Sequence, residues 1–342
     1  MQRTVHPLMP LPQPPSFRLF TLLILLALLA PARIFAVTCT MQAEMTDDQR
    51  NALLQASRKL ALDIQGGDSA AVRSLTLPNV AAQFDPIANT IRRIAPMMTG
   101  ASITIDAMFG LDASDLKSTQ DQTQFFCDSP KSNLHTDITI PGLPPGKYAL
   151  ALVHATGVAR PQQIALLLAS NNGAWQLGGF FVRPMLLAGH DSVWYWTKAR
   201  AYAQKAQNWN AHFYYEIAVY LASPVAFLNT PNLEKLLKEQ ADIKAEDLPG
   251  EKPLAISAAN GEVFSITNMH TDDSLGGLDL VISYTAADTS DPVATRTHIL
   301  DLMKALLAQH PELRDAFHGL WVFANAPGRP PFGIEQPMSD LH

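Results

Sequence analysis

The sequence has 342 residues, with 25 basic and 31 acidic side chains, a formal net charge of −6 and two cysteines. Residues 1–36 carry three of the basic side chains and no acidic one, so the remaining 306 residues have a charge of −9. An acidic chain disfavours nucleic acids and anionic lipid surfaces as partners. A hydrophobic fraction of 47% is ordinary for a folded protein and argues against a largely disordered one.

The first 36 residues are typical of a secretory signal peptide. Arg3 and Arg18 precede an apolar run of 12 residues over 19–30, and Ala36 is a small residue at a suitable cleavage position. As a helix, this run would cover roughly 18 Å of a hydrocarbon core about 30 Å thick, which favours cleavage over a membrane anchor. We therefore expect a signal peptide over 1–36 and an exported protein, periplasmic or extracellular, that meets a membrane only before cleavage.

The two cysteines, Cys39 and Cys127, follow the predicted cleavage position. In an oxidising compartment two cysteines suggest one disulfide. Lipidation of Cys39 is an alternative, although Thr38 fits the residues that precede a lipidated cysteine poorly. A second alternative to the disulfide is that Cys39 and Cys127 are two separate buried thiols. We expect the bridge, which would hold the new N-terminus onto the first domain.

Helical segments open the chain after the signal. Thr46 and Gln49 have the spacing of a capping box, which predicts a helix over 46–65 that ends at a pair of glycines. A short second helix is expected over 68–75. A third is expected to start with Asp85 as its N-cap, because proline follows it at the first helical position.

Alternating apolar residues then predict a series of antiparallel strands. The expected strands cover residues 103–109, 123–127, 137–140, 148–155, 164–169 and 175–182. Asn172 and Gly173 separate the last two apolar runs, and an Asn-Gly pair in this position is the strongest short signal for a β-hairpin.

Helices followed by antiparallel strands over residues 43–184 resemble the nuclear-transport-factor-two-like (cystatin-like) superfamily. The matching features are the opening helix, the break at Gly66-Gly67-Asp68 and the closing hairpin that ends in residues 175–181. The resemblance implies an α+β domain over 37–189, in which N-terminal helices pack on a curved antiparallel sheet around a hollow. The loop over 143–148 would suit a β-sandwich equally well, and this is the alternative for the domain.

Residues 190–245 are expected to form a helical hairpin rich in aromatic residues. Over about 192–224 this segment resembles one tetratricopeptide unit, from which Lys198 and Ser223 depart. The matching positions are Tyr195, Ala199, Tyr202, Ala211, Tyr215 and Ala218. Since about three repeats are usually needed for a stable array and the sequence holds no second copy, we expect the hairpin to pack on its neighbours.

The aromatic residues of this hairpin support two interpretations. They can form a core, or they can line a groove that binds a protein partner, because aromatic side chains dominate interface hot spots. The candidate partner-binding residues are Trp194, Trp196, Trp209 and Tyr214.

A charged segment with proline and glycine over 246–253 is interpreted as a linker to a last module over 254–342. This module is predicted to be a small β-β-α-β unit with an irregular tail over 328–342. Its expected strands cover 262–268, 278–284 and 320–323, and its expected helix runs from 292 to about 310. The whole chain is thus predicted to belong to the α+β class.

Residues able to carry chemistry are few and scattered. His135, Asp137 and His154 lie on or beside predicted strands and would form an acid–base cluster if they faced one hollow. The sequence has no nucleophile elbow and no glycine-rich nucleotide loop.

The sequence predicts no metal site and no cofactor. The loop over 270–273, His-Thr-Asp-Asp, is interpreted as solvated rather than metal-binding. His298, His310 and His318 are expected to be too far apart to share a metal ion and to lie on the surface.

The leading functional hypothesis is therefore an exported protein that binds a small-molecule ligand or a protein partner without catalysis. The alternatives are a small-molecule enzyme with its pocket in the first domain, and a structural or assembly role for the C-terminal module. Convergence of His135, Asp137 and His154 in a pocket would favour the enzyme.

Overall fold

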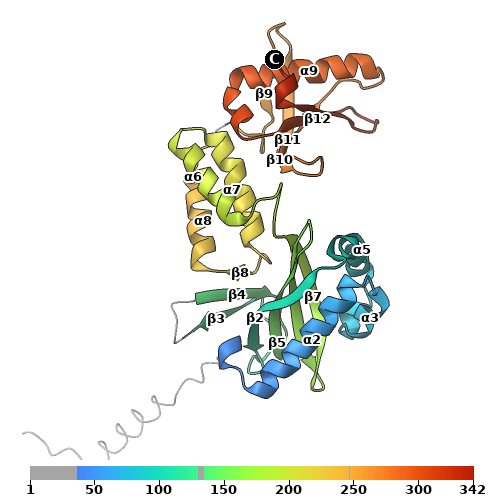
Figure 1. The fold of residues 1–342 in the computed structure, drawn as a ribbon, viewed down its shortest axis with the longest axis vertical. Helices are drawn as coiled ribbons and strands as arrows, with labels where there is room; N and C mark the ends of the chain where they lie inside the picture. The colour runs from blue at the N-terminus through green and yellow to red at the C-terminus, as the bar shows by residue number, and fades with distance from the viewer. Residues whose placement is uncertain (1–36, 130–134, 246) are drawn as a thin grey trace, which may run out of the picture. The chain divides into compact units, whose positions relative to one another are not determined.

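The structure is a computed structural model that describes residues 37–129, 135–245 and 247–342 (Figure 1). A short strand and several helices come first in this described part of the chain. The predicted signal peptide over 1–36 lies outside the described residues. The first elements are β1 (Thr38–Met41), η1 (Gln42–Glu44), α2 (Asp47–Gln65), α3 (Ser69–Ser74), α4 (Pro78–Ala81), α5 (Asp85–Ile94) and η2 (Ala95–Met98).

The predicted helix starts are found for α2 and α3. Thr46 and Gln49 form the reciprocal capping box, and the Asp68 side chain accepts from the third residue after it, at 2.9 Å. The N-cap of α5 is Phe84, so the assignment of Asp85 to that position was wrong. Phe84 already has helical backbone angles, and Asp85 therefore falls in the first turn, where its charge still favours the helix N-terminus.

Two antiparallel sheets follow the helices. Their strands are β2 (Ser102–Asp112), β3 (Gln122–Asp128), β4 (His135–Pro141), β5 (Lys147–Thr156), β6 (Gln162–Asn171) and β7 (Ala174–Pro184). One sheet has the order β1-β2-β5-β6-β7, and the other joins β3 and β4 to the short strand β8 (Leu228–Asn229). The predicted hairpin is β6–β7, with Asn172 and Gly173 both at positive φ in its turn.

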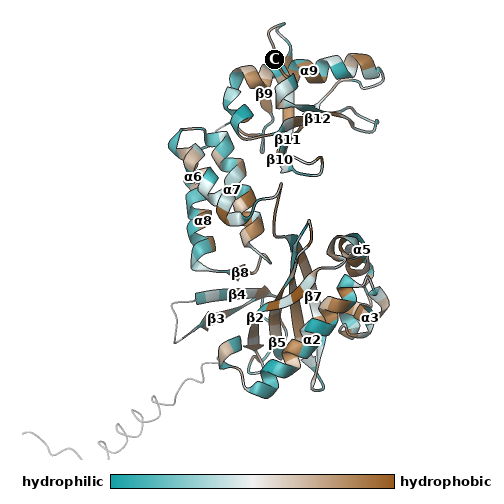
Figure 2. Ribbon diagram, in the orientation of Figure 1, coloured by the Kyte–Doolittle hydropathy of each residue, from teal (hydrophilic) through white to brown (hydrophobic). Residues whose placement is uncertain are grey.

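Both faces of the five-stranded sheet are covered by apolar side chains. Along β5, Ala151 and Val153 point to the cluster formed with α2 and α5, whereas Leu150 points to the cluster formed with the three-stranded sheet. Figure 2 shows the matching pattern on α2, where hydrophobic and hydrophilic residues alternate around the helix. The sheet is thus the middle layer of this domain, with helices on one side and the smaller sheet on the other.

The aromatic segment forms α6 (Ser192–Gln204) and α7 (Asn208–Ala222), followed by α8 (Pro231–Ala241). Asp191 caps α6 by accepting from Trp194 N at 2.8 Å, and Thr230 caps α8. Residues 247–253, which belong to the predicted linker, contain neither helix nor strand.

The C-terminal module is an α+β unit built on a five-stranded sheet of order β13-β12-β11-β10-β9. Its elements are β9 (Leu254–Ser257), β10 (Val263–Asp272), β11 (Asp279–Thr285), α9 (Pro292–Gln309), η3 (Pro311–Asp315), β12 (Gly319–Asn325), β13 (Phe332–Pro337) and η4 (Met338–Asp340). β11 and β12 are parallel and are connected through α9, while the other neighbours are antiparallel. The predicted β-β-α-β order corresponds to β10-β11-α9-β12.

The tail predicted to be irregular contains a strand, so that prediction was wrong. Residues 332–337 form β13, which pairs with β12 along its length. Because β13 is an edge strand and Pro337 is its last residue, proline removes no bond from the middle of a ladder.

The hairpin and the C-terminal module share one hydrophobic cluster. It includes residues of α6, α7 and α8 together with residues of α9 and of the module's sheet.

Within the described ranges, no helix combines the length and the apolar character needed to cross a membrane.

Candidate functional site

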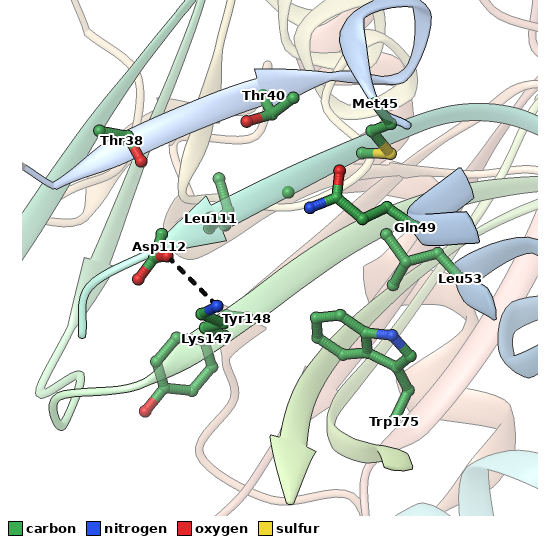
Figure 3. A pocket seen from close by; sticks show the side chains of 11 residues that line it. Thr38, Thr40, Met45, Gln49, Leu53, Leu111, Asp112, Lys147, Tyr148 and Trp175 are labelled. Carbon is green, nitrogen blue, oxygen red and sulfur yellow. Dashed lines mark ion pairs between the residues drawn. The ribbon is translucent and has the colours of Figure 1, made fainter. Parts of the chain in front are cut away.

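A small cavity lies between β1, the first turns of α2 and the neighbouring ends of β2, β5 and β7 (Figure 3). Its volume is about 130 Å³. The lining residues are Thr38, Thr40, Met45, Gln49, Leu53, Gly110, Leu111, Asp112, Lys147, Tyr148 and Trp175. A volume below the roughly 300 Å³ of a typical ligand pocket suits a small molecule or one end of a larger one.

One wall of the cavity is β1, whose two faces have different roles. Thr38 and Thr40 line the cavity, whereas Cys39 and Met41 pack against the cluster shared with the three-stranded sheet. Cys39 forms the predicted disulfide with Cys127, across a Cα–Cα distance of 5.1 Å. Since β1 is an edge strand that pairs with β2 alone, this bond ties the wall to the rest of the domain.

The cavity combines apolar surface with a few directed polar groups. Trp175 and Leu53 supply apolar surface, and the amide nitrogen of Gln49 points into the cavity while its Oε1 accepts from the Thr46 backbone (Figure 3). Asp112 and Lys147 form an exposed ion pair at 4.0 Å, which contributes about 0–1 kcal/mol at most. A ligand with an aromatic or alkyl group and a neutral acceptor fits this lining: the apolar group would lie on Trp175, and the acceptor would receive a hydrogen bond from Gln49.

The three candidate acid–base residues lie on two different sheets. His135, on β4, contacts Asp128 and lies 3.0 Å from the Asp137 carboxylate. Hydrogen bonding to Asp128 raises the pKa of His135 above its ordinary value. His154, on β5, instead faces Asp106 at 3.8 Å. The structure thus brings His135 and Asp137 together and leaves His154 with another partner.

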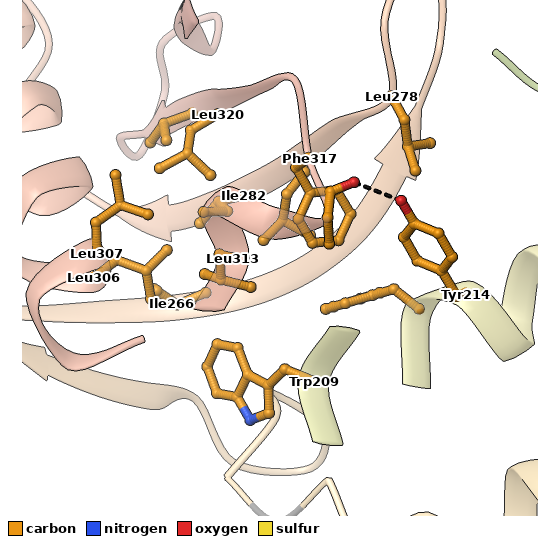
Figure 4. Packing of buried hydrophobic residues seen from close by; sticks show 14 of the residues in the cluster. Trp209, Tyr214, Ile266, Leu278, Ile282, Leu306, Leu307, Leu313, Phe317 and Leu320 are labelled. Carbon is orange, nitrogen blue, oxygen red and sulfur yellow. Dashed lines mark hydrogen bonds between the residues drawn. The ribbon is translucent and has the colours of Figure 1, made fainter. Parts of the chain in front are cut away.

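Two of the four candidate partner-binding residues are buried. Trp209 is 5% exposed and stacks on His310 with ring centroids 3.8 Å apart. Tyr214 is 4% exposed and donates a hydrogen bond to the Ala316 carbonyl at 2.6 Å (Figure 4). Burial raises the pKa of Tyr214. Both side chains join the hairpin to the C-terminal module, and His310 lies in this contact rather than on the open surface.

The other two, Trp194 and Trp196, are half-buried. Trp194 stacks on His190 at a centroid distance of 3.7 Å. Trp196 donates to the Glu239 carboxylate at 2.7 Å, and Arg200 holds the same carboxylate through two bonds of 2.7 Å. The hydrogen bond from Arg200 is the main cause that lowers the pKa of Glu239 to about 2. These contacts position α8 against α6.

The interpretation of residues 270–273 as a loop was wrong, because 270–272 belong to β10, where they pair with β11, and only Asp273 follows the strand. The polar groups of this segment are used within the chain. Asp273 accepts a hydrogen bond from the Ala188 backbone at 2.9 Å, and His270 contacts Asn268. His298 contacts Glu262 at 3.4 Å and is exposed.

Sequence reasoning did not single out Gln49 and Trp175 as lining one cavity. Gln49 was identified through its capping box and Trp175 through its hairpin, and both assignments are structural. The signal available in the sequence was that each residue has a group its local role does not use. The capping box uses the Oε1 atom of Gln49 and leaves its NH2 group over, and the hairpin turn does not require an indole at residue 175.

Comparison with protein-family models, with characterised proteins and with solved structures finds no match for this chain.

Proposed function

We propose that this chain is an exported protein that binds a small-molecule ligand without catalysis, and that the cavity behind β1 is its binding site. The observation that carries the proposal is the wall formed by β1. A strand of four residues at a sheet edge is held by a disulfide, and it forms one wall of an open cavity into which Gln49 directs a donor. The disulfide is also consistent with an oxidising compartment.

The ligand class follows from the lining. Trp175 and Leu53 favour an aromatic or alkyl group, and the amide of Gln49 favours a carbonyl or another neutral acceptor. Asp112 and Lys147 neutralise each other at the rim, so the cavity has no strong preference for a charged ligand. The enzyme hypothesis has less support, because His154 does not join His135 and Asp137.

Binding can be tested with benzamide, which offers one ring and one carbonyl acceptor. In saturation-transfer NMR on the disulfide-bonded protein, we expect a benzamide signal that is lost in Thr40→Trp, because the larger side chain fills the cavity. Thr104→Trp is the matched control, since Thr104 is exposed on the neighbouring strand β2 and does not line the cavity. No signal from the wild type, or equal signals from both variants, would remove the cavity from the proposal.

Export has its own test. The mass of the intact protein recovered from the periplasm or medium should correspond to a chain that begins at Val37. A mass that includes residues 1–36 would contradict cleavage, and an added acyl mass would indicate lipidation.

A further inference from the structure

Three ionisable side chains meet at one end of the C-terminal sheet, on three neighbouring elements. Asp279 is the first residue of β11, His318 directly precedes β12, and Glu335 lies on β13. Parallel pairing places Asp279 opposite Gly319, while antiparallel pairing brings β13 along the other side of β12. The three side chains therefore converge over the backbone of Gly319.

Two glycines make room for this convergence. A Cβ at residue 319 would lie 2.5 Å from the Glu335 Oε1 atom and 3.0 Å from the Asp279 Oδ1 atom. A Cβ at residue 277 would lie 2.4 Å from the His318 ring. Real Cβ atoms do not approach other atoms at 2.4 or 2.5 Å, so this arrangement of side chains depends on glycine at both positions.

The backbone holds the histidine in place. His318 N donates to the Leu278 carbonyl at 2.7 Å, and its own carbonyl accepts from Met338 N at 2.8 Å. The Nδ1 atom of His318 lies 3.2 Å from the Asp279 Oδ1 atom. Asp279, His318 and Glu335 each offer one nitrogen or oxygen atom able to bind a metal ion, and these three atoms lie within 4.8 Å of one another.

Two carboxylate oxygens in this cluster are buried without a hydrogen-bond partner. They are Oδ2 of Asp279, a residue that is 1% exposed, and Oε1 of Glu335. Burying a carboxylate oxygen without a hydrogen-bond partner is costly, and two neighbouring carboxylates repel each other. Among the residues that the structure describes, His318 is the one basic side chain found beside these two carboxyl groups, and a single imidazolium cannot neutralise two carboxylates.

We propose that Asp279, His318 and Glu335 bind one divalent transition-metal ion. Two carboxylate oxygens and one imidazole nitrogen form a ligand set suited to Zn²⁺ and its first-row neighbours, whereas Mg²⁺ and Ca²⁺ favour oxygen alone. Tetrahedral ligands at about 2.1 Å from an ion lie roughly 3.4 Å apart, so small side-chain rotations would complete the site. His318 is 54% exposed, which leaves the fourth position open to water or to a ligand.

This site shares no residue with the cavity behind β1 and does not depend on the proposed function. The alternative without a metal ion is that the carboxyl groups of Asp279 and Glu335 share a proton beside His318.

Calorimetric titration of ZnCl₂ into the untagged, chelator-treated, disulfide-bonded protein separates the two. We expect one Zn²⁺ per chain, with affinity at least about tenfold weaker in Glu335→Gln and in His318→Ala, because even the loss of a group that only supports a metal ligand typically costs about 10–100-fold in affinity. His298→Ala is the matched control, because His298 is also 54% exposed and contacts a carboxylate, and it should bind Zn²⁺ like the wild type.

A second measurement guards against variants that fail to fold. Saturating Zn²⁺ should raise the melting temperature of the wild type and of His298→Ala, since an ion that binds only the folded state stabilises it, and the rise should be smaller in Glu335→Gln. No saturable binding to the wild type, or equal affinity in Glu335→Gln, His318→Ala and the control, would overturn the proposal and favour the shared proton.

Discussion

Removing the disulfide tests how β1 is held and whether the cavity depends on it. The perturbation is the double variant Cys39→Ala/Cys127→Ala. Alanine is chosen because Cys127 is completely buried in an apolar cluster, where a serine hydroxyl would lack a partner. β1 has only four residues paired with β2, so without the covalent bond we expect it to open before the rest of the domain.

The magnitude follows from the size of the loop that the bond closes. Cys39 and Cys127 are 88 residues apart, for which the chain-entropy model gives about 4–5 kcal/mol as an upper figure. A domain of this size loses about 2–4 °C of melting temperature per kcal/mol, so the expected decrease is on the order of 10 °C. This is a large part of a typical stability of about 5–15 kcal/mol.

Circular dichroism and hydrogen exchange followed by mass spectrometry measure the two effects. The wild type treated with reductant should melt like the double variant, and the double variant should not respond to reductant. Exchange should increase first over Thr38–Met41, and benzamide binding should be lost with it. A melting temperature within about 2 °C of the wild type, together with unchanged protection of β1, would refute the reasoning.

Three further predictions concern stability measured by denaturant unfolding. Arg200 lowers the pKa of Glu239 from 4.5 to about 2, so this carboxylate stabilises the fold above pH 4.5 and loses that effect as the pH falls towards 2. In Glu239→Gln the free energy of unfolding should therefore depend less on pH between about 4.5 and 2. Gly173→Ala should cost about 1–2 kcal/mol, because Gly173 has a φ of +83° in a left-handed turn position. Tyr214→Phe should cost about 1–3 kcal/mol by leaving a buried carbonyl without its donor, whereas Tyr220→Phe, at an exposed tyrosine, should change stability by less than about 0.5 kcal/mol.

Local rules explain which elements could be predicted from the sequence. The capping box at Thr46 and Gln49 and the turn at Asn172-Gly173 are determined by residues within a few positions of each other. The disulfide was predictable for a different reason, since two cysteines allow a single intramolecular pairing once the compartment is given.

Elements that depend on distant partners could not be predicted in the same way. β8 has two residues and exists because it pairs with β4, almost a hundred positions earlier in the chain. β13 looks irregular on its own because of the surrounding prolines, yet β12 offers it a complete row of hydrogen-bonding groups. The backbone of such segments is decided by the neighbouring strand rather than by their own composition.

The same distinction separates the two candidate sites. Spacing along the chain cannot reveal Asp279, His318 and Glu335 as a group, because the parallel pairing of β11 with β12 through α9 is what brings the first two together. Glycine is the one signal that remains visible in the sequence: Gly319 follows His318 directly, and Gly277 lies just ahead of Asp279. A glycine next to an ionisable residue at the start of a strand leaves space above the backbone, and side chains from the two neighbouring strands can meet there. Substituting Gly319 by alanine should therefore displace Glu335 and weaken Zn²⁺ binding without removing any ligand, which a chance grouping of ionisable residues that binds no ion would not show.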